Sequence, residues 1–161
     1  MFLGLDSAGK STLLHVLKHG RSATLTPTIH PTLEEVNIAN VNFRIIDLGD
    51  QHSSRLAFQQ YFSDLDGIVF LVDSQDRDRF SESKVDLDAL LADQRLEGKP
   101  LLILGNKNDT SGAVSEEELR SALGLTQTTG KGDVPLTDMR PLEVFMCSAI
   151  LKQGYEEGMH F

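Results

Sequence analysis

Continuous apolar runs alternate along the chain with stretches of helical periodicity. Ile68–Val72, Leu101–Leu104 and Val144–Cys147 are almost purely apolar, which is typical of parallel strands buried on both faces. The opening residues Met1–Leu5 predict a fourth, shorter apolar strand. The order strand, loop, helix therefore repeats along the sequence.

Leucines recur at helical spacing in two of the intervening segments. These are Lys10–His19 and Ser81–Gln94, and both are predicted to be helices. A third helix is predicted to start at Ser115, where Ser-Glu-Glu-Glu fits a capping box. In the first two helices we expect the inward-facing positions to be Leu13, Leu14, Leu17, Leu87, Leu90 and Leu91.

Two further segments alternate apolar and polar residues around Asn40. Leu33–Ala39 and Val41–Leu48 predict a two-stranded antiparallel ribbon. Arg21–Thr32 and Thr126–Pro141 have no periodicity and are interpreted as loops. The predicted fold is a single α/β domain over residues 1–161, with a mostly parallel sheet, one antiparallel edge strand and helices on both faces. In such sheets ligands bind at the carboxyl ends of the strands.

Charge and composition narrow the classes of partner. The 161 residues carry a formal net charge of −9, which argues against a nucleic-acid partner, because phosphate backbones require basic patches. No apolar run approaches the ~20 residues that span a bilayer. The single cysteine, Cys147, cannot form an internal disulfide and is interpreted as a buried structural thiol.

The segment GLDSAGKS, Gly4–Ser11, fits the phosphate-loop pattern G-x-x-x-x-G-K-[ST] and lies between a predicted strand and a predicted helix. Successive backbone N–H groups and the helix N-terminus form an anion site. Lys10 is predicted to reach the β- and γ-phosphates, with a catalytic role, and the Ser11 hydroxyl to bind Mg²⁺. The predicted nucleotide contacts here come from Asp6, Ser7, Ala8, Gly9, Lys10, Ser11 and Thr12.

A base-reading segment, GNKND, follows the Leu101–Leu104 run directly. The Asp109 carboxylate can accept hydrogen bonds from guanine N1–H and the exocyclic amine, a donor pair that adenine lacks. Asn106 can either bond the base edge or brace the phosphate loop, and the Lys107 stem can cover the base. A backbone N–H of the Cys147-Ser148-Ala149 turn can reach guanine O6.

In this order GLDSAGKS, a Pro-Thr loop, DLG, NKND and CSA resemble the motifs of Ras-like small GTPases. The chain is most similar to the Sar-type (secretion-associated, Ras-related) GTPases of the Arf branch, and the similarity covers essentially the whole sequence. An aspartate at the third position of the phosphate loop, here Asp6, resembles the loops of the Arf/Sar branch rather than those of Ras. The segments that resemble Sar-type sequence specifically are TPTIHPTLEE, TTGKG, RPLEVFMCS and QGY.

The resemblance implies further site residues. Thr28 matches the threonine that joins Mg²⁺ when GTP is bound, and Asp47 matches the carboxylate that holds Mg²⁺ through water. Ala149 and Ile150 match backbone positions that line guanine. Lys131, in TTGKG, resembles a second phosphate-loop fragment, but no Ser or Thr follows it, so a mobile loop is the favoured interpretation.

The resemblance also implies a cellular role. Sar-type GTPases cycle between GDP-bound cytoplasmic and GTP-bound forms that lie peripherally on the endoplasmic reticulum membrane. They direct assembly of the coat protein complex II for transport to the Golgi. They meet an exchange factor and a coat subunit that activates GTP hydrolysis. They attach to the membrane through an N-terminal amphipathic helix, and we expect that helix and most of the C-terminal helix to be missing from this chain.

The segment DLGDQH departs from the Asp-x-Gly-Gly-His pattern of the family, with Asp50 at the second glycine and Gln51 at the histidine. Gln51 is predicted to orient the attacking water, as glutamine does in Ras and Arf relatives. Asp50 either repels the γ-phosphate and weakens the GTP state, or points to solvent while its N–H still bonds. Two hypotheses therefore stand, a slow Mg²⁺-dependent GTP hydrolase and a GDP-locked binding module. NKND disfavours a third, a phosphate-loop ATPase or kinase.

Overall fold

The fold is built on a six-stranded sheet in the order β2-β3-β1-β4-β5-β6. The computed structural model describes residues 1–21, 23, 25, 32–38, 41–47, 59–131 and 140–160. β2 runs antiparallel to β3, and all other neighbouring strands are parallel. This arrangement confirms the predicted mostly parallel sheet with one antiparallel edge strand. The strands are β1 (Phe2–Leu3), β2 (Thr32–Ile38), β3 (Val41–Asp47), β4 (Ile68–Asp73), β5 (Leu101–Asn106) and β6 (Leu142–Met146).

Strand bounds differ from the apolar runs where backbone geometry intervenes. β1 ends at Leu3 because Gly4 adopts a φ of 130° and leaves the extended conformation. β5 extends past the leucines to Asn106, whose side chain is buried. β6 stops before Cys147, although the Cys147 N–H still donates to the carbonyl of Gly105 at 2.8 Å.

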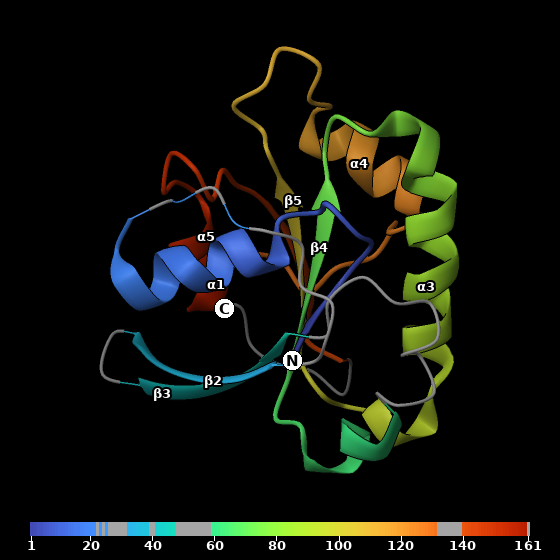
Figure 1. Ribbon diagram of the computed structural model, residues 1–161. Coiled ribbons are helices and arrows are strands. Elements are labelled where there is room, and N and C mark those ends of the chain that lie inside the picture. Colours follow the sequence, from blue (N-terminus) through green and yellow to red (C-terminus); the bar gives the residue numbers. More distant parts are fainter. Residues whose placement is uncertain are drawn as a thin grey trace.

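Helices cover both faces of the sheet, as Figure 1 shows, with α1 and α5 on one side and α3 and α4 on the other. One apolar core joins the sheet to α3 and α4, and a second joins it to α1 and α5. Three short 3-10 turns accompany these elements along the chain. They are η2 (Gln59–Asp64) before β4, η3 (Arg77–Arg79) directly before α3, and η4 (Gln94–Leu96) after α3. The α-helices are α1 (Lys10–His19), α3 (Phe80–Ala92), α4 (Glu116–Leu123) and α5 (Tyr155–Met159).

Helix bounds follow the sequence signals closely, with one error in facing. α1 begins at Lys10 and ends at His19, as predicted, and Ser115 forms the predicted capping box with Glu118. The prediction that Leu91 faces inward is wrong, because 37% of this residue is exposed. Leu91 lies in the last turn of α3, one residue before the helix ends, and the fully buried Leu96 of η4 packs in the core beyond it.

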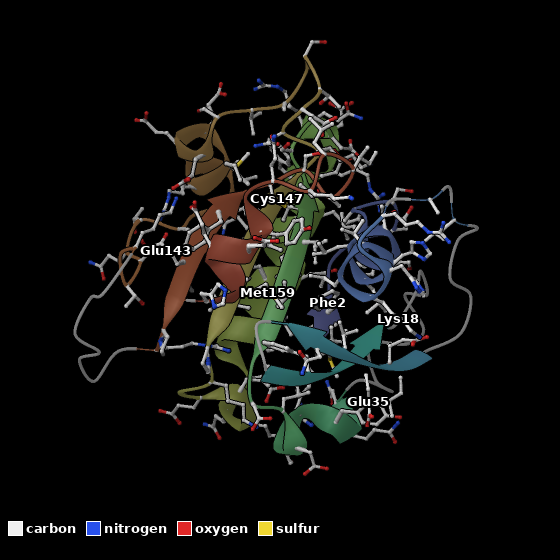
Figure 2. All side chains as sticks on the ribbon, turned by 90° about the vertical axis from the view of Figure 1, so that its left-hand side faces the viewer. Phe2, Lys18, Glu35, Glu143, Cys147 and Met159 are labelled. Atoms are coloured by element: carbon white, nitrogen blue, oxygen red, sulfur yellow. The ribbon has the colours of Figure 1, made fainter. Side chains whose placement is uncertain are left out.

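The free edge of β6 is covered by the described part of the loop that follows α4. The Thr129 N–H donates to the carbonyl of Leu142 at 2.8 Å, and the Gly130 N–H donates to Glu143 at 2.8 Å. Figure 2 labels Glu143 at this edge. Lys131 pairs with Glu116 at 2.6 Å, so the loop is fastened at this point. Capping an edge strand in this way blocks pairing with another chain.

Glu143 is the buried centre of that edge. Its side chain is 1% exposed, and it pairs with Arg120 and accepts the Val144 N–H at 2.7 Å. Burial opposes ionisation of Glu143, but these hydrogen bonds outweigh it and hold the pKa of the carboxyl below its usual value. The charged form of Glu143 is therefore part of the folded structure.

No helix in the described part of the chain is long and apolar enough to cross a membrane.

Candidate functional site

The phosphate loop connects β1 to α1 and lies beside the carboxyl end of β4 (Figure 1). Two glycines are required by close approaches. A Cβ on Gly4 would lie 2.1 Å from the Leu71 carbonyl oxygen, and a Cβ on Gly9 would lie 2.2 Å from Asn106 Nδ2. Ser7 adopts a φ of 59°, which is uncommon for a residue other than glycine. Backbone strain of this kind concentrates at ligand-binding loops.

Lys10 opens α1 and folds back over the loop. Its ammonium donates to the carbonyls of Gly4 at 3.0 Å and Leu5 at 2.8 Å, and the residue is only 5% exposed. A buried cation at a helix N-terminus makes a strongly anion-attracting position. Ser11 follows Lys10 in sequence and lies in the first turn of the same helix.

Asn106, at the end of β5, holds the phosphate loop against the loop after β6. Its Nδ2 donates to the Ala8 carbonyl at 2.8 Å, and its Oδ1 accepts the Ala149 N–H at 3.0 Å. Its own carbonyl accepts from Ser74, through the hydroxyl at 2.7 Å and the N–H at 2.9 Å. Asn106 is 2% exposed. Of the two roles open at the sequence level, the side chain in this structure takes the bracing one.

The turn after β6 is fixed by the same group of contacts. The Ala149 N–H, which the resemblance placed near guanine, donates here to Asn106, while the neighbouring Ile150 is 56% exposed. Cys147 is fully buried, as predicted, and its carbonyl accepts the Asn108 N–H at 3.1 Å. Burial, with a smaller contribution from the Asp109 charge, raises the pKa of the Cys147 thiol to about 12. Figure 2 shows Cys147 near the ends of the parallel strands.

Asp109 and Lys107 follow β5 at the same edge of the sheet. Asp109 is exposed and makes no hydrogen bond or ion pair with the described residues. Lys107 adopts a φ of 63°, and its ammonium bonds to Asp73 Oδ2 at 2.6 Å. Asp73 ends β4 and is the register partner of Asn106 on β5. The ion pair therefore fixes one end of the Lys107 side chain, whose stem was predicted to cover the base.

Three contributors to this site were missed by sequence reasoning, namely Asp73, Ser74 and Arg79. Arg79, in η3, donates to the phosphate-loop residue Asp6, with 2.5 Å between Nη2 and Oδ1. The guanidinium holds the pKa of the Asp6 carboxyl below its usual value. A signal was present, because a polar run follows the buried strand at the end where ligands bind in such sheets.

Several predicted residues lie wholly or partly outside the part of the chain that the structure describes. Thr28, Asp50 and Gln51 lie outside the described residues, and for Asp47 only the backbone is described, at the carboxyl end of β3. Asp47 is the register partner of Phe2 in β1, the strand that leads into the phosphate loop. No group of three or more His, Cys, Asp or Glu side chains suited to a metal occurs in the described parts of the chain. A site built from two hydroxyls, one carboxylate and phosphate oxygens, as the sequence predicts, contains no such group.

Comparison with known proteins gives a consistent family. Residues 1–161 match the family model described as the ADP-ribosylation factor family. The small COPII coat GTPase SAR1 of Giardia intestinalis is 46% identical over 160 residues, which cover 98% of this chain and 84% of that protein. The protein of the same name from Nicotiana tabacum is 39% identical, covering 100% of this chain and 85% of its own length.

Other Arf-type proteins are similar at lower identity. ADP-ribosylation factor-like protein 3 of Chlamydomonas reinhardtii is 35% identical, covering 100% of this chain and 86% of that protein. The solved structure of the Arl6 BBS3 small GTPase from Trypanosoma brucei, with bound nucleotide analogue GppNp, matches with a TM-score of 0.81 at 28% identity. That match covers 99% of this chain and 91% of the other. This chain is a member of the Arf family of small GTPases, which are GTP hydrolases with a guanine-nucleotide-binding fold.

Proposed function

We propose that this chain is a Sar-type switch that binds GDP and GTP with Mg²⁺ and hydrolyses GTP slowly in the absence of an activating protein. The observation that carries the nucleotide assignment is the Asn106 clamp. It fastens the phosphate loop at Ala8 to the turn at Ala149, which supports a phosphate site and a base site at one edge of the sheet. Asp109, exposed at that edge, is the guanine-reading acceptor.

In this proposal each predicted residue has one task. Lys10 and the N–H groups of the phosphate loop hold the β- and γ-phosphates, and the Lys107 stem covers the base. Gln51 orients the attacking water. No arginine within the chain is assigned to the transition state, so an activating protein supplies that charge and intrinsic turnover is slow.

The proposed Mg²⁺ ligands are Ser11, Thr28 and Asp47. Hydroxyl and carboxylate oxygens are the hard ligands that this ion prefers, alongside phosphate oxygens and water. Ser11 is the last residue of the phosphate loop, and the backbone of Asp47 pairs with Phe2 in the strand that leads into the loop, which fits the assignment. When bound, the ion neutralises charge on the β- and γ-phosphates.

Asp109→Asn tests the guanine assignment. Asparagine replaces one carboxylate acceptor with a donor, so it faces one of the two guanine donors unfavourably but matches the C2 carbonyl of xanthine. We expect GDP affinity to fall by roughly 100-fold or more, about 2.7 kcal/mol, while xanthosine diphosphate binds better than to the parent. Asp64→Asn, an exposed carboxylate in η2, is the charge-matched control. Unchanged GDP affinity in Asp109→Asn would remove Asp109 from the site.

The cellular part of the proposal rests on the SAR1 relatives, which are named for the COPII coat. We assign to this chain the initiation of coat assembly for endoplasmic-reticulum-to-Golgi transport. An exchange factor and a GTPase-activating coat subunit are its partners. It is cytoplasmic with GDP and peripheral on the endoplasmic reticulum membrane with GTP. Recruitment of purified coat subunits to liposomes by the GTP-loaded protein, and not by the GDP-loaded one, tests this role.

A second candidate function follows from Asp50 in the sequence DLGDQH. A carboxylate at this position opposes the γ-phosphate and restricts a backbone that family members keep flexible with glycine. The chain would then be a GDP-locked module with weak GTP binding and little hydrolysis. Asp50→Gly should raise the affinity for a non-hydrolysable GTP analogue about tenfold or more and leave GDP affinity unchanged. No change in either affinity would eliminate this candidate.

A further inference from the structure

An acid stands inside the phosphate loop, and one arginine from a distant part of the chain contacts it. Arg79 and Asp6 are 73 residues apart in sequence, yet Nη2 of Arg79 lies 2.5 Å from Oδ1 of Asp6. The same guanidinium uses Nε to bond Glu82 of α3 at 2.9 Å. Because two of its nitrogens are engaged in different directions, its orientation is fixed.

Asp6 poses an electrostatic problem for any polyphosphate bound by this loop. Its side chain is 39% exposed, and its backbone lies in the stretch whose N–H groups are assigned to the phosphates. Arg79 and Lys10 both hold the pKa of the Asp6 carboxyl below its usual value. Protonation therefore cannot remove the negative charge near neutral pH, and only a neighbouring cation can offset it.

Arg79 is placed to supply that offset. It belongs to η3, which follows the carboxyl end of β4, so it approaches the phosphate loop from the ligand-binding edge of the sheet. Arg77, two residues earlier, is different. It is 57% exposed and lies 3.6 Å from Glu118 on α4, away from the loop.

We infer that Arg79 is a positioning residue for the nucleotide phosphates, acting by neutralising Asp6; this inference rests on the proposed nucleotide site. Arg79 does not need to touch the phosphates in this role. Its contribution grows with the charge of the ligand, so it favours the triphosphate more than the diphosphate. The competing interpretation is a mechanical tether that holds η3 and α3 onto the loop through the Arg79–Asp6 bond.

Neutralising Asp6, alone and together with Arg79, separates the two interpretations. If Arg79 acts by neutralising the negative charge of Asp6, then removing that charge makes Arg79 dispensable. If the bond is a tether, then removing either partner breaks it, and removing both repairs nothing. Asp6→Asn is informative alone, because neutralisation predicts equal or tighter binding of the nucleotide and a tether predicts weaker binding.

The experiment is calorimetric titration of the nucleotide-free full chain with GDP and with a non-hydrolysable GTP analogue in Mg²⁺. The variants are Arg79→Gln, Asp6→Asn and the double variant, with Arg77→Gln as the charge-matched control. We expect Arg79→Gln to weaken GDP about tenfold, equivalent to about 1.4 kcal/mol, and the analogue about 30-fold. Asp6→Asn should bind at least as tightly as the parent, the double variant should lie within about threefold of the parent, and Arg77→Gln should not change affinity.

Three outcomes overturn the inference. They are parental affinity in Arg79→Gln, weaker binding in Asp6→Asn, or a double variant as weak as Arg79→Gln. If Arg79→Gln does not fold, as judged by circular dichroism, the comparison of Asp6→Asn with the parent still decides the sign. Failure of the parent itself to bind GDP in the same series overturns the proposed nucleotide site, and with it this inference, which distinguishes that result from the other three.

Discussion

Replacing Asn106 with alanine removes the clamp between the two halves of the proposed nucleotide site. The change deletes the bond from Nδ2 to the Ala8 carbonyl, 2.8 Å, and the bond from the Ala149 N–H to Oδ1, 3.0 Å. The two backbone groups left behind belong to residues that are 1% and 2% exposed, so bulk water does not reach them easily.

The expected loss in the free energy of unfolding follows from these two unpaired backbone groups. A buried polar group left without a partner costs about 1–3 kcal/mol, so two cost roughly 2–6 kcal/mol. The shortened side chain leaves space beside polar partners, where a water molecule can satisfy part of this demand. We therefore expect a loss of about 2–4 kcal/mol in the free energy of unfolding, and a drop of roughly 4–16 °C in Tm for a domain of this size.

The assay pairs thermal unfolding with GDP titration and uses Ser74→Ala as the control. Ser74 donates to the Asn106 carbonyl through both its hydroxyl, 2.7 Å, and its N–H, 2.9 Å, so alanine removes only one of two bonds. We expect Ser74→Ala to lose about 1 kcal/mol of stability and to keep GDP affinity within about threefold of the parent. Asn106→Ala should weaken GDP roughly 30-fold or more, since about 2 kcal/mol of loop positioning is lost.

One result would refute this reasoning. If Asn106→Ala and Ser74→Ala weaken GDP binding equally, then the contact between the loops does not support the site, and Asn106 is an ordinary buried polar residue of β5.

Three further outcomes are expected. Glu143→Gln should cost about 3 kcal/mol at neutral pH, because a buried ion pair loses one partner. The folded pKa of Glu143 lies below its unfolded value, so this contribution is present above the unfolded pKa and is lost as pH falls through the folded one. The stabilities of parent and variant, measured by denaturant titration, should therefore converge in acid. Cys147, with its pKa raised to about 12, should stay unmodified by a thiol reagent at pH 8 until the chain is unfolded, and rapid labelling of the folded protein would contradict its burial. Asp73→Asn should free Lys107 and speed GDP dissociation by roughly threefold to tenfold, about 0.7–1.4 kcal/mol, whereas Asp88→Asn, which breaks an exposed pair on α3, should leave the dissociation rate unchanged.

Local patterns were sufficient for the six strands and for α1, α3 and α4, but they did not predict α5 or the 3-10 turns, and they were insufficient for the contacts between elements. α1 and the capping box of α4 were predicted at their starting residues because capping and periodicity are properties of neighbouring positions. Leu91 was assigned to the wrong face because the spacing of leucines does not show where a helix runs past the core.

The site shows the same division. The phosphate loop is a single run of consecutive residues, and so is the base-reading segment, so each could be identified as a motif. The Arg79–Asp6 and Lys107–Asp73 pairs join residues that are 73 and 34 positions apart, and no local spacing predicts them. Lys131 was interpreted as part of a mobile loop because no Ser or Thr follows it, and its contacts with Glu116 of α4 and, with Nζ 4.6 Å from the ring centre, with Phe145 could not be predicted from its neighbours in sequence.

The central claim is that the edge of the sheet carrying the phosphate loop, Asn106 and Asp109 binds guanine nucleotide. The most direct measurement is competition between GDP and ADP for the purified chain in the presence of Mg²⁺. The account predicts saturable GDP binding and an ADP affinity at least about 100-fold weaker, because adenine lacks the donor pair that Asp109 accepts. Equal affinities for the two nucleotides, or no binding of GDP, would contradict it.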